Sequence, residues 1–133
     1  MTFAVLALAA ALSAPVRVYP VTEIVDVYDG DTATIVVDLG LDIRVVKTIR
    51  VFGIDTPEVR PLATREAGHR SRDWLDDRLR ACPDLTIITG TRNGRPEVGK
   101  YGRLLGTFVC EGVDLTQEMI ERGLGVPYSG GTK

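Results

Sequence analysis

Beyond Val18 the chain alternates short apolar runs, rich in β-branched residues, with clusters of turn residues. This pattern is typical of short strands, because alternation places one face of a strand in the core and glycine or aspartate clusters permit tight turns. Asp29-Gly30-Asp31 and Gly40 are the first such interruptions. We expect strands over Val21–Tyr28, Thr32–Asp38, Ile43–Ile54, Leu85–Thr89 and Leu104–Cys110.

Two segments show helical spacing instead. From Leu62 to Arg80, apolar residues that include Trp74 and Leu75 recur on one face, so Trp74 is expected to pack in the core. His69 lies in the same segment, away from the loops with reactive groups, and is expected at the surface or an edge. The second helix is predicted after Asp114, a suitable N-cap.

The second helix is expected to end at Gly123, and the tail Pro127–Lys133 is expected to be loose. Three strands, a helix, two strands and a helix predict a β-rich α+β domain. Five strands of this length commonly close into an oligonucleotide/oligosaccharide-binding (OB) type barrel, here with two packed helices. The 133 residues fit one such domain.

The N-terminal segment is a separate feature, and we expect an apolar segment over residues 1–17 and the domain over 18–133. Phe3–Ala14 is apolar but too short for a stable membrane span, which needs roughly twenty residues. Its length and the small residues of ALSA suit a signal peptide, although Met1-Thr2 has no Lys or Arg. We expect a secreted or envelope-associated protein; a retained hydrophobic helix and a cytoplasmic protein are the alternative.

The amino-acid composition excludes several classes of protein. With 44% hydrophobic and 26% charged residues, the chain is neither disordered nor collagen-like. Two cysteines are too few for a disulfide-dense scaffold or a four-ligand zinc site, and a single histidine excludes a histidine-rich metal centre. The net charge of −2 argues weakly against nucleic-acid binding, but the charges come in blocks. Six acids and no base lie between Glu23 and Asp42, and seven bases against three acids between Ile43 and Arg72.

Three stretches concentrate reactive groups: Tyr28–Thr32 (YDGDT), Arg50–Glu58 (RVFGIDTPE) and Lys100–Arg103 (KYGR). Each stretch alone has an ordinary structural interpretation: the first is a hairpin turn, the second a salt-bridged strand end and the third a solvated loop. Taken together, they supply carboxylate oxygens for Ca²⁺ or Mg²⁺, arginines for phosphate oxygens and a glutamate for water. This inventory suits metal-assisted phosphodiester hydrolysis.

The ordered trio DGDT, RVFGIDTPE and KYGR resembles the staphylococcal nuclease (thermonuclease) family, from about Val21 to Tyr128. The resemblance implies an OB barrel and a Ca²⁺-dependent nuclease that cuts DNA and RNA with little sequence preference. Products that end in 3′-phosphate also follow from the resemblance alone. Partners would be single-stranded or frayed DNA or RNA, and we expect a monomer.

The resemblance also implies a role for each matching residue. One Ca²⁺ ion would be bound by the carboxylates of Asp31 and Asp55 and the carbonyl of Thr56, with Asp29 behind them near metal-bound water. Arg50 and Arg103 would contact the scissile phosphate, and Glu58 would act on the attacking water. The further expected substrate contacts are Lys100, Tyr101 and Tyr128.

The chain departs from the best-known member in two respects. We expect no counterpart of the third, C-terminal helix within these residues. The sequence contains only three lysines, so its affinity for long nucleic acid is expected to be modest. A different class also remains open, namely a catalytically silent OB module that binds nucleic acid or protein. A hydrolase restricted to small phosphodiesters is a weaker alternative. Whether Mg²⁺ can replace Ca²⁺ is left open.

Cys82 and Cys110 form the last candidate pair. Cys82 precedes one predicted strand and Cys110 ends its expected antiparallel partner, so the two are expected to lie close enough for a disulfide. Export would permit that bond. Two free buried thiols remain the alternative, and neither cysteine is expected to be catalytic.

Overall fold

The computed structural model describes residues 16–129 and contains one barrel with two helices. Five long strands form the barrel, and four two-residue strands extend its edges or connections. The long strands are β1 (Val16–Asp29), β2 (Thr32–Asp38), β3 (Arg44–Val51), β5 (Leu85–Arg92) and β7 (Leu104–Cys110). The short ones are β4 (Ile54–Asp55), β6 (Arg95–Pro96), β8 (Val113–Asp114) and β9 (Val126–Pro127).

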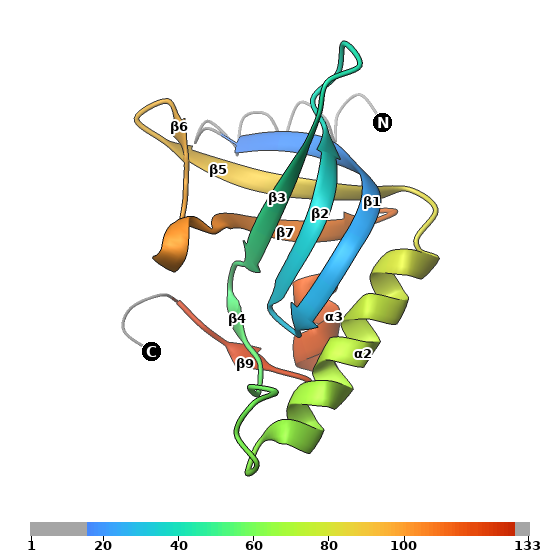
Figure 1. Ribbon diagram of the computed structural model, residues 1–133, viewed down its shortest axis with the longest axis vertical. Coiled ribbons are helices and arrows are strands. Elements are labelled where there is room, and N and C mark those ends of the chain that lie inside the picture. Colours follow the sequence, from blue (N-terminus) through green and yellow to red (C-terminus); the bar gives the residue numbers. More distant parts are fainter. Residues whose placement is uncertain (1–15, 130–133) are drawn as a thin grey trace.

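Strand order β5-β1-β2-β3-β7 closes into a barrel through the pairing of β5 with β7. The pairing of β3 with β7 is parallel and the other pairings are antiparallel, so the barrel is mixed. Strand β1 curves strongly because its first residues pair with β5 and its later residues with β2 (Figure 1). This five-stranded β-rich α+β barrel with two helices is the OB-type architecture predicted from the order of elements.

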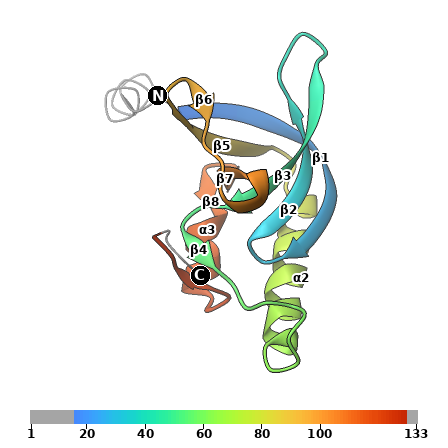
Figure 2. The same ribbon diagram turned by 60° about the vertical axis from the view of Figure 1, so that its left-hand side comes forward.

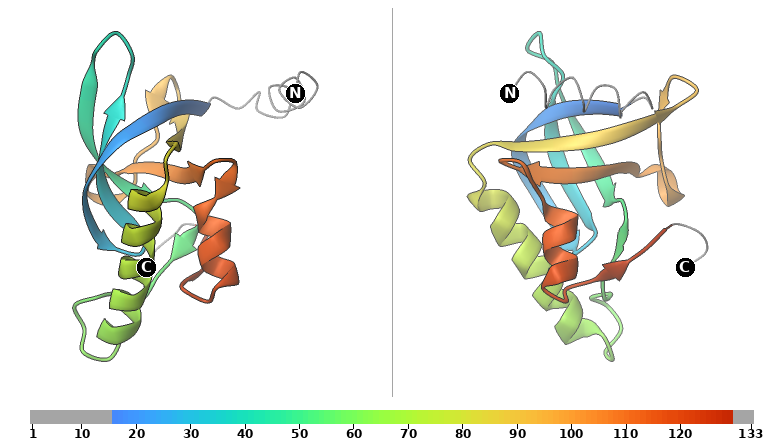
Figure 3. Two further views of the ribbon diagram at one scale, coloured as in Figure 1. Left: turned by 90° about the vertical axis from the view of Figure 1, so that its right-hand side faces the viewer. Right: turned by 180° about the vertical axis from the view of Figure 1, so that it is seen from behind.

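Helices α2 (Arg65–Ala81) and α3 (Leu115–Glu121) lie at the end of the barrel opposite the tip of the β2–β3 hairpin (Figure 3). Leu75 and Leu79 of α2 are buried in the core with Ile35, Ile87 and Phe108 of the strands. The predicted cap of α3 is present, since Asp114 accepts hydrogen bonds from the N–H groups of the next two helical positions.

Several predicted boundaries were wrong. Strand β1 begins at Val16 instead of Val21, because its first five residues pair with β5. Helix α2 begins at Arg65 instead of Leu62, since residues 62–64 form a turn. The predicted strand Ile43–Ile54 is interrupted at Gly53, whose φ is +88°.

The tail is also more ordered than expected. Pro127 pairs with Ile54 through β9, and the N–H of Tyr128 donates to the carbonyl of Gly53 at 3.0 Å. The apolar run predicted over Phe3–Ala14 lies outside the described residues. Between residues 16 and 129, no helix is both long enough and apolar enough to cross a membrane.

Candidate active site

The three motif stretches meet in one cleft of about 390 Å³, which we call the motif cleft. It is bounded by the β1–β2 turn, the end of β3, the loop after β4 and the 3₁₀ turn η1 (Lys100–Gly102). Its lining combines acids, bases and two tyrosines: Tyr28, Asp29, Asp31, Arg50, Glu58, Val59, Arg60, Lys100, Tyr101 and Arg103. The fold therefore brings together residues that lie up to 75 positions apart in the chain.

Asp31 is the most enclosed acid of this cleft, with 3% of its surface exposed. Its Oδ2 accepts two hydrogen bonds from Thr56, one from the N–H at 3.0 Å and one from Oγ1 at 3.1 Å. Its Oδ1 accepts from Oγ1 of Thr32 at 3.2 Å, and Nη2 of Arg50 lies 3.5 Å from Oδ2. These three hydrogen bonds and the nearby guanidinium fix the orientation of the Asp31 carboxylate.

Asp29 shares the turn with Asp31, separated from it by Gly30. Its Oδ1 accepts a hydrogen bond from the N–H of Asp31 at 3.0 Å. Burial, together with the negative charge of Asp31, raises the pKa of Asp29 from 3.8 to about 7. Only glycine fits between them, because a β-carbon on Gly30 would lie 2.8 Å from carbons of both Ser71 and Thr56. Two carboxylates are thus crowded into one buried turn.

The expected calcium ligands fit a hard cation by their chemistry. Asp55 is half-buried in β4, and Thr56, directly after it, is hydrogen-bonded to Asp31, so β4 runs past the β1–β2 turn. The expected ligands Asp31, Asp55 and the Thr56 carbonyl offer oxygen atoms only, which suits Ca²⁺ or Mg²⁺ better than a softer metal.

Arg50 is held rigidly at the end of β3. Its Nη1 donates to the carbonyls of Val51 at 2.6 Å and Ile54 at 3.0 Å, while Nη2 approaches Asp31. The guanidinium carbon lies 5.7 Å from the ring centre of Tyr128. The structure therefore brings Tyr128 to the edge of the site, beside an arginine whose rotamer is fixed by the backbone.

Arg103 approaches the cleft from the other side. Its Nε donates to the carbonyl of Lys100 at 3.2 Å, and its Nη1 donates to Oγ1 of Thr32 at 3.2 Å. Its guanidinium carbon lies 5.5 Å from the ring centre of Tyr101. Because Thr32 also donates to Asp31, a chain of hydrogen bonds links Arg103 to the buried acid.

Glu58 is the exposed carboxylate of the cleft, and its backbone is fixed from below. The Glu58 carbonyl accepts a hydrogen bond from Oγ1 of Thr64 at 2.8 Å. Gly68 of α2 packs directly beneath it, since a β-carbon on Gly68 would lie 2.6 Å from the Glu58 carbonyl oxygen. The start of α2 thus positions the loop that presents Glu58.

Comparison with known families agrees with this geometry. The model of the family described as staphylococcal nuclease homologue matches residues 48–131, more than half of the chain. The chain belongs to the staphylococcal nuclease family. The match covers the second and third motif stretches and Tyr128, whereas Asp29 and Asp31 precede it. No curated protein matches the chain.

Sequence reasoning missed several residues that build this nuclease-family site. Thr32 lies within the first motif stretch and no role was predicted for it, yet it connects Arg103 to Asp31. Arg60 and Tyr28 line the cleft, and Gly68 and Thr64 support Glu58. The one signal in the sequence was position, since Tyr28, Thr32 and Arg60 lie within or next to the motifs.

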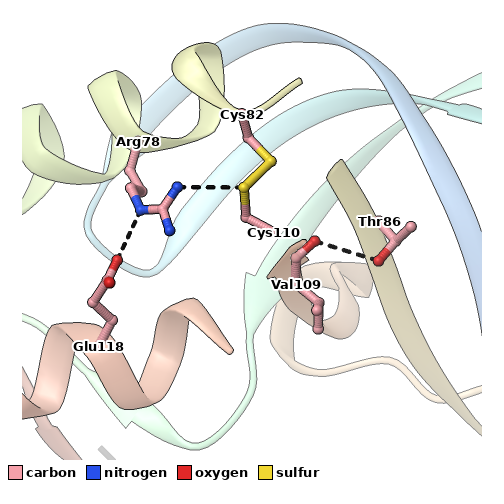
Figure 4. Close-up of a disulfide and its surroundings, with 6 residues drawn as sticks. All are labelled: Arg78, Cys82, Thr86, Val109, Cys110 and Glu118. Atoms are coloured by element: carbon pink, nitrogen blue, oxygen red, sulfur yellow. Dashed lines mark hydrogen bonds and ion pairs between the residues drawn. A yellow bond between two sulfur atoms is a disulfide. The ribbon is translucent and has the colours of Figure 1, made fainter. Parts of the chain in front are cut away.

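The remaining candidates lie away from the cleft. Cys82 and Cys110 form a disulfide with Cα atoms 6.0 Å apart (Figure 4). The Sγ of Cys110 accepts a hydrogen bond from Nη1 of Arg78 at 3.3 Å. Glu111 lies beside both sulfurs, but the disulfide leaves no thiolate there to bind a metal. His69 is half-buried on α2.

Trp74 packs against the core, as predicted, and is partly buried. The guanidinium carbon of Arg122 lies 5.6 Å from its ring centre. One part of the indole therefore packs on the core, and the Arg122 guanidinium lies near its ring.

Proposed function

We propose that this chain is a Ca²⁺-dependent nuclease that hydrolyses phosphodiester bonds in DNA or RNA with little sequence preference. The observation that carries the proposal is the motif cleft, where Arg50, Arg103, Glu58 and the buried Asp31 line one space. A phosphodiester needs positive charge on its oxygens and a base for the attacking water, and this cleft offers both.

Arg50 and Arg103 are the groups that would hold the phosphate. Both keep part of the guanidinium occupied with backbone or threonine oxygens, so their positions are set before substrate arrives. Preorganised donors stabilise charge that develops on phosphoryl oxygens without reorganising during the reaction. One guanidinium group from β3 and one from the residue that precedes β7 would contact the phosphate from two sides.

Glu58 would accept the proton of the attacking water. It is exposed in the cleft, while Thr64 and Gly68 fix its backbone. Lys100 and Tyr101, which line the same cleft, would contact the phosphate of a neighbouring nucleotide. Tyr128, over Arg50, would lie beside a base or sugar.

Asp31, Asp55 and the carbonyl of Thr56 would hold the Ca²⁺ ion. When bound, the ion would neutralise negative charge on the scissile phosphate as a Lewis acid. Thr56 fixes the orientation of the Asp31 carboxylate through its two hydrogen bonds. Asp29 would accept hydrogen bonds from water in this region.

The decisive experiment is digestion of single-stranded DNA with Ca²⁺, with Mg²⁺ and with EDTA, followed by analysis of the fragment ends. We expect cleavage with Ca²⁺, none with EDTA, and fragments that end in 3′-phosphate. Lack of cleavage by folded protein with Ca²⁺ would favour the silent OB module.

Glu58→Gln separates chemistry from binding, because it removes the proton acceptor and keeps the size of the side chain. We expect cleavage to fall at least 100-fold while an oligonucleotide still binds. The matched control is Glu66→Gln on α2, whose carboxylate is 96% exposed and outside the cleft. The control should cleave at the wild-type rate.

The same proposal includes export to the envelope or the medium. It is supported by the Cys82–Cys110 disulfide, since such bonds persist mainly in oxidising compartments. Alkylation of the protein as isolated from its native cells tests it: without reductant, neither cysteine should react.

A further inference from the structure

A second and larger hollow, of about 770 Å³, lies next to the motif cleft. We call it the hairpin groove, because residues of the β2–β3 hairpin line one side and residues of β5, β6 and η1 the other. In Figure 2 the β2–β3 hairpin and the β5–β6 hairpin extend from the barrel on separate sides, and β1 begins near the β5–β6 hairpin. None of the motif stretches accounts for most of this surface.

The charged side chains that line the hairpin groove are all positive. Of the described residues that line it, four are basic and none is Asp or Glu. The bases are Arg17 on β1, Lys47 on β3, Arg95 on β6 and Arg103, and the first three are exposed. In a chain with a net charge of −2, four bases without an acid along one groove indicate an anionic ligand.

The groove also presents aromatic and apolar surface between these charges. Tyr19 contributes from β1, and Tyr101, 88% exposed, stands at the end near the cleft. Val45 and Leu104 add apolar lining. Basic groups interleaved with aromatic and apolar surface are what a single nucleic-acid strand requires, because phosphates take the charges and bases stack on the rings.

Continuity with the motif cleft identifies the occupant. Tyr101 and Arg103 line both the cleft and the groove, so a strand whose phosphate lies at Arg103 can continue past Tyr101 into the groove. We propose that the hairpin groove binds the part of a single-stranded nucleic acid that flanks the scissile phosphodiester. This inference rests on the proposed function and adds a binding site to it.

The test measures binding of short and long strands separately. All proteins carry Glu58→Gln so that the probe stays intact, and anisotropy of fluorescein-labelled dT₃ and dT₁₂ is recorded with Ca²⁺. The groove variant combines Arg17→Gln, Lys47→Gln and Arg95→Gln. The control variant makes the same change of charge on α2, with Arg70→Gln, Arg72→Gln and Arg80→Gln, none of which lines the groove.

We expect the groove variant to bind dT₁₂ at least 10-fold more weakly and dT₃ within twofold of the parent. The slope of log affinity against log salt should fall by roughly 2, since each single-strand phosphate contact contributes about 0.7. The control variant should lose less than threefold. Equal losses in the two variants, or parent affinities that do not rise from dT₃ to dT₁₂, would overturn the inference.

Two further measurements distinguish nucleic-acid binding in the groove from binding of an acidic peptide and from failure of the proposed function. Poly-glutamate, added as a competitor, should displace dT₁₂ far less well than unlabelled dT₁₂ does; equal displacement would overturn the inference in favour of an acidic peptide. Cleavage of a dinucleotide by the protein with Glu58 intact tests the proposed function separately. That cleavage should be the same with and without the groove substitutions.

Discussion

Gly68 on α2 lies directly against the backbone of Glu58, with no room for a side chain between them. A β-carbon at Gly68 would lie 2.6 Å from the Glu58 carbonyl oxygen and 2.7 Å from its carbonyl carbon. The glycine sits inside a helix, where it costs about 1 kcal/mol relative to alanine. The close approach explains why a poor helix former occupies this position.

Gly68→Ala should therefore impair catalysis more than folding. The added methyl group must displace the loop that presents Glu58, and a shift of about 1 Å in a reacting group can lower a rate 100-fold. We expect kcat to fall about 10- to 100-fold. The gain in helix propensity offsets part of the overpacking cost of about 1–3 kcal/mol, so the variant should still fold.

A double-mutant cycle distinguishes positioning of Glu58 from general damage. If Gly68 acts through Glu58, Gly68→Ala should lower the residual rate of the Glu58→Gln protein by less than twofold. A loss in that background as large as the loss in the wild type would contradict the positioning role. Thermal melting of all four proteins provides the control for folding.

Arg103→Lys should preserve the fold and reduce the rate. Arginine contacts the Lys100 carbonyl and Thr32 Oγ1 through two different nitrogens. Lysine keeps the charge but has no planar fork with which to hold both oxygens and still face a phosphate. We expect kcat to fall about 100-fold, the range found for loss of one preorganised donor. The matched control is Arg92→Lys, an exposed arginine outside both hollows, which should retain full activity.

Local pattern was sufficient for much of the fold. Thr32–Asp38 and Leu104–Cys110 were predicted with their observed bounds, because glycine or aspartate turns flank each β-branched run. The extra length of β1 was not visible, since its pairing with β5 joins residues some seventy positions apart. Likewise, residues 62–64 have helical spacing, yet the Thr64 hydroxyl binds the Glu58 carbonyl at the base of a turn.

In the candidate site too, the residues within the motifs could be predicted from the sequence, whereas contacts between distant segments could not. Order and spacing of the motifs pointed to Asp31, Arg50, Glu58 and Arg103, all of which line the motif cleft. Sequence could not show that Gly68 supports Glu58, because that contact exists only once α2 packs beneath the loop. What each of these residues does in catalysis remains a prediction for the mutants above.

Asp29 makes the stability of the metal-free protein depend on pH. Its pKa is raised from 3.8 to about 7 on folding, so the folded state holds this proton more tightly than the unfolded state. Its contribution to stability is complete below pH 3.8 and is lost as the pH rises through about 7. In EDTA, the free energy of unfolding of wild type minus that of Asp29→Asn should therefore decrease across this window.

Urea denaturation of both proteins between pH 4 and pH 8 provides the measurement. Asp29→Asn is the appropriate comparison because it keeps an oxygen acceptor for the N–H of Asp31 and removes only the titration. A difference in stability that stays constant over the range would contradict the raised pKa. In wild type, Ca²⁺ should restore stability most at the upper end of the range, since a ligand that binds only the folded state stabilises it.

Removal of the Cys82–Cys110 disulfide should destabilise the domain without changing the motif cleft. The bond closes a loop that spans 28 positions and joins the end of α2 to the end of β7. Loop-closure entropy for that length predicts a loss of about 3–4 kcal/mol in the Cys82→Ser/Cys110→Ser protein. Reduced wild type should unfold at nearly the same urea concentration as this variant. At 25 °C the kcat of the folded variant should match that of wild type, because neither cysteine lines the cleft. A fall in kcat that exceeds the unfolded fraction would instead connect this covalent link to the positions of Arg50 or Glu58.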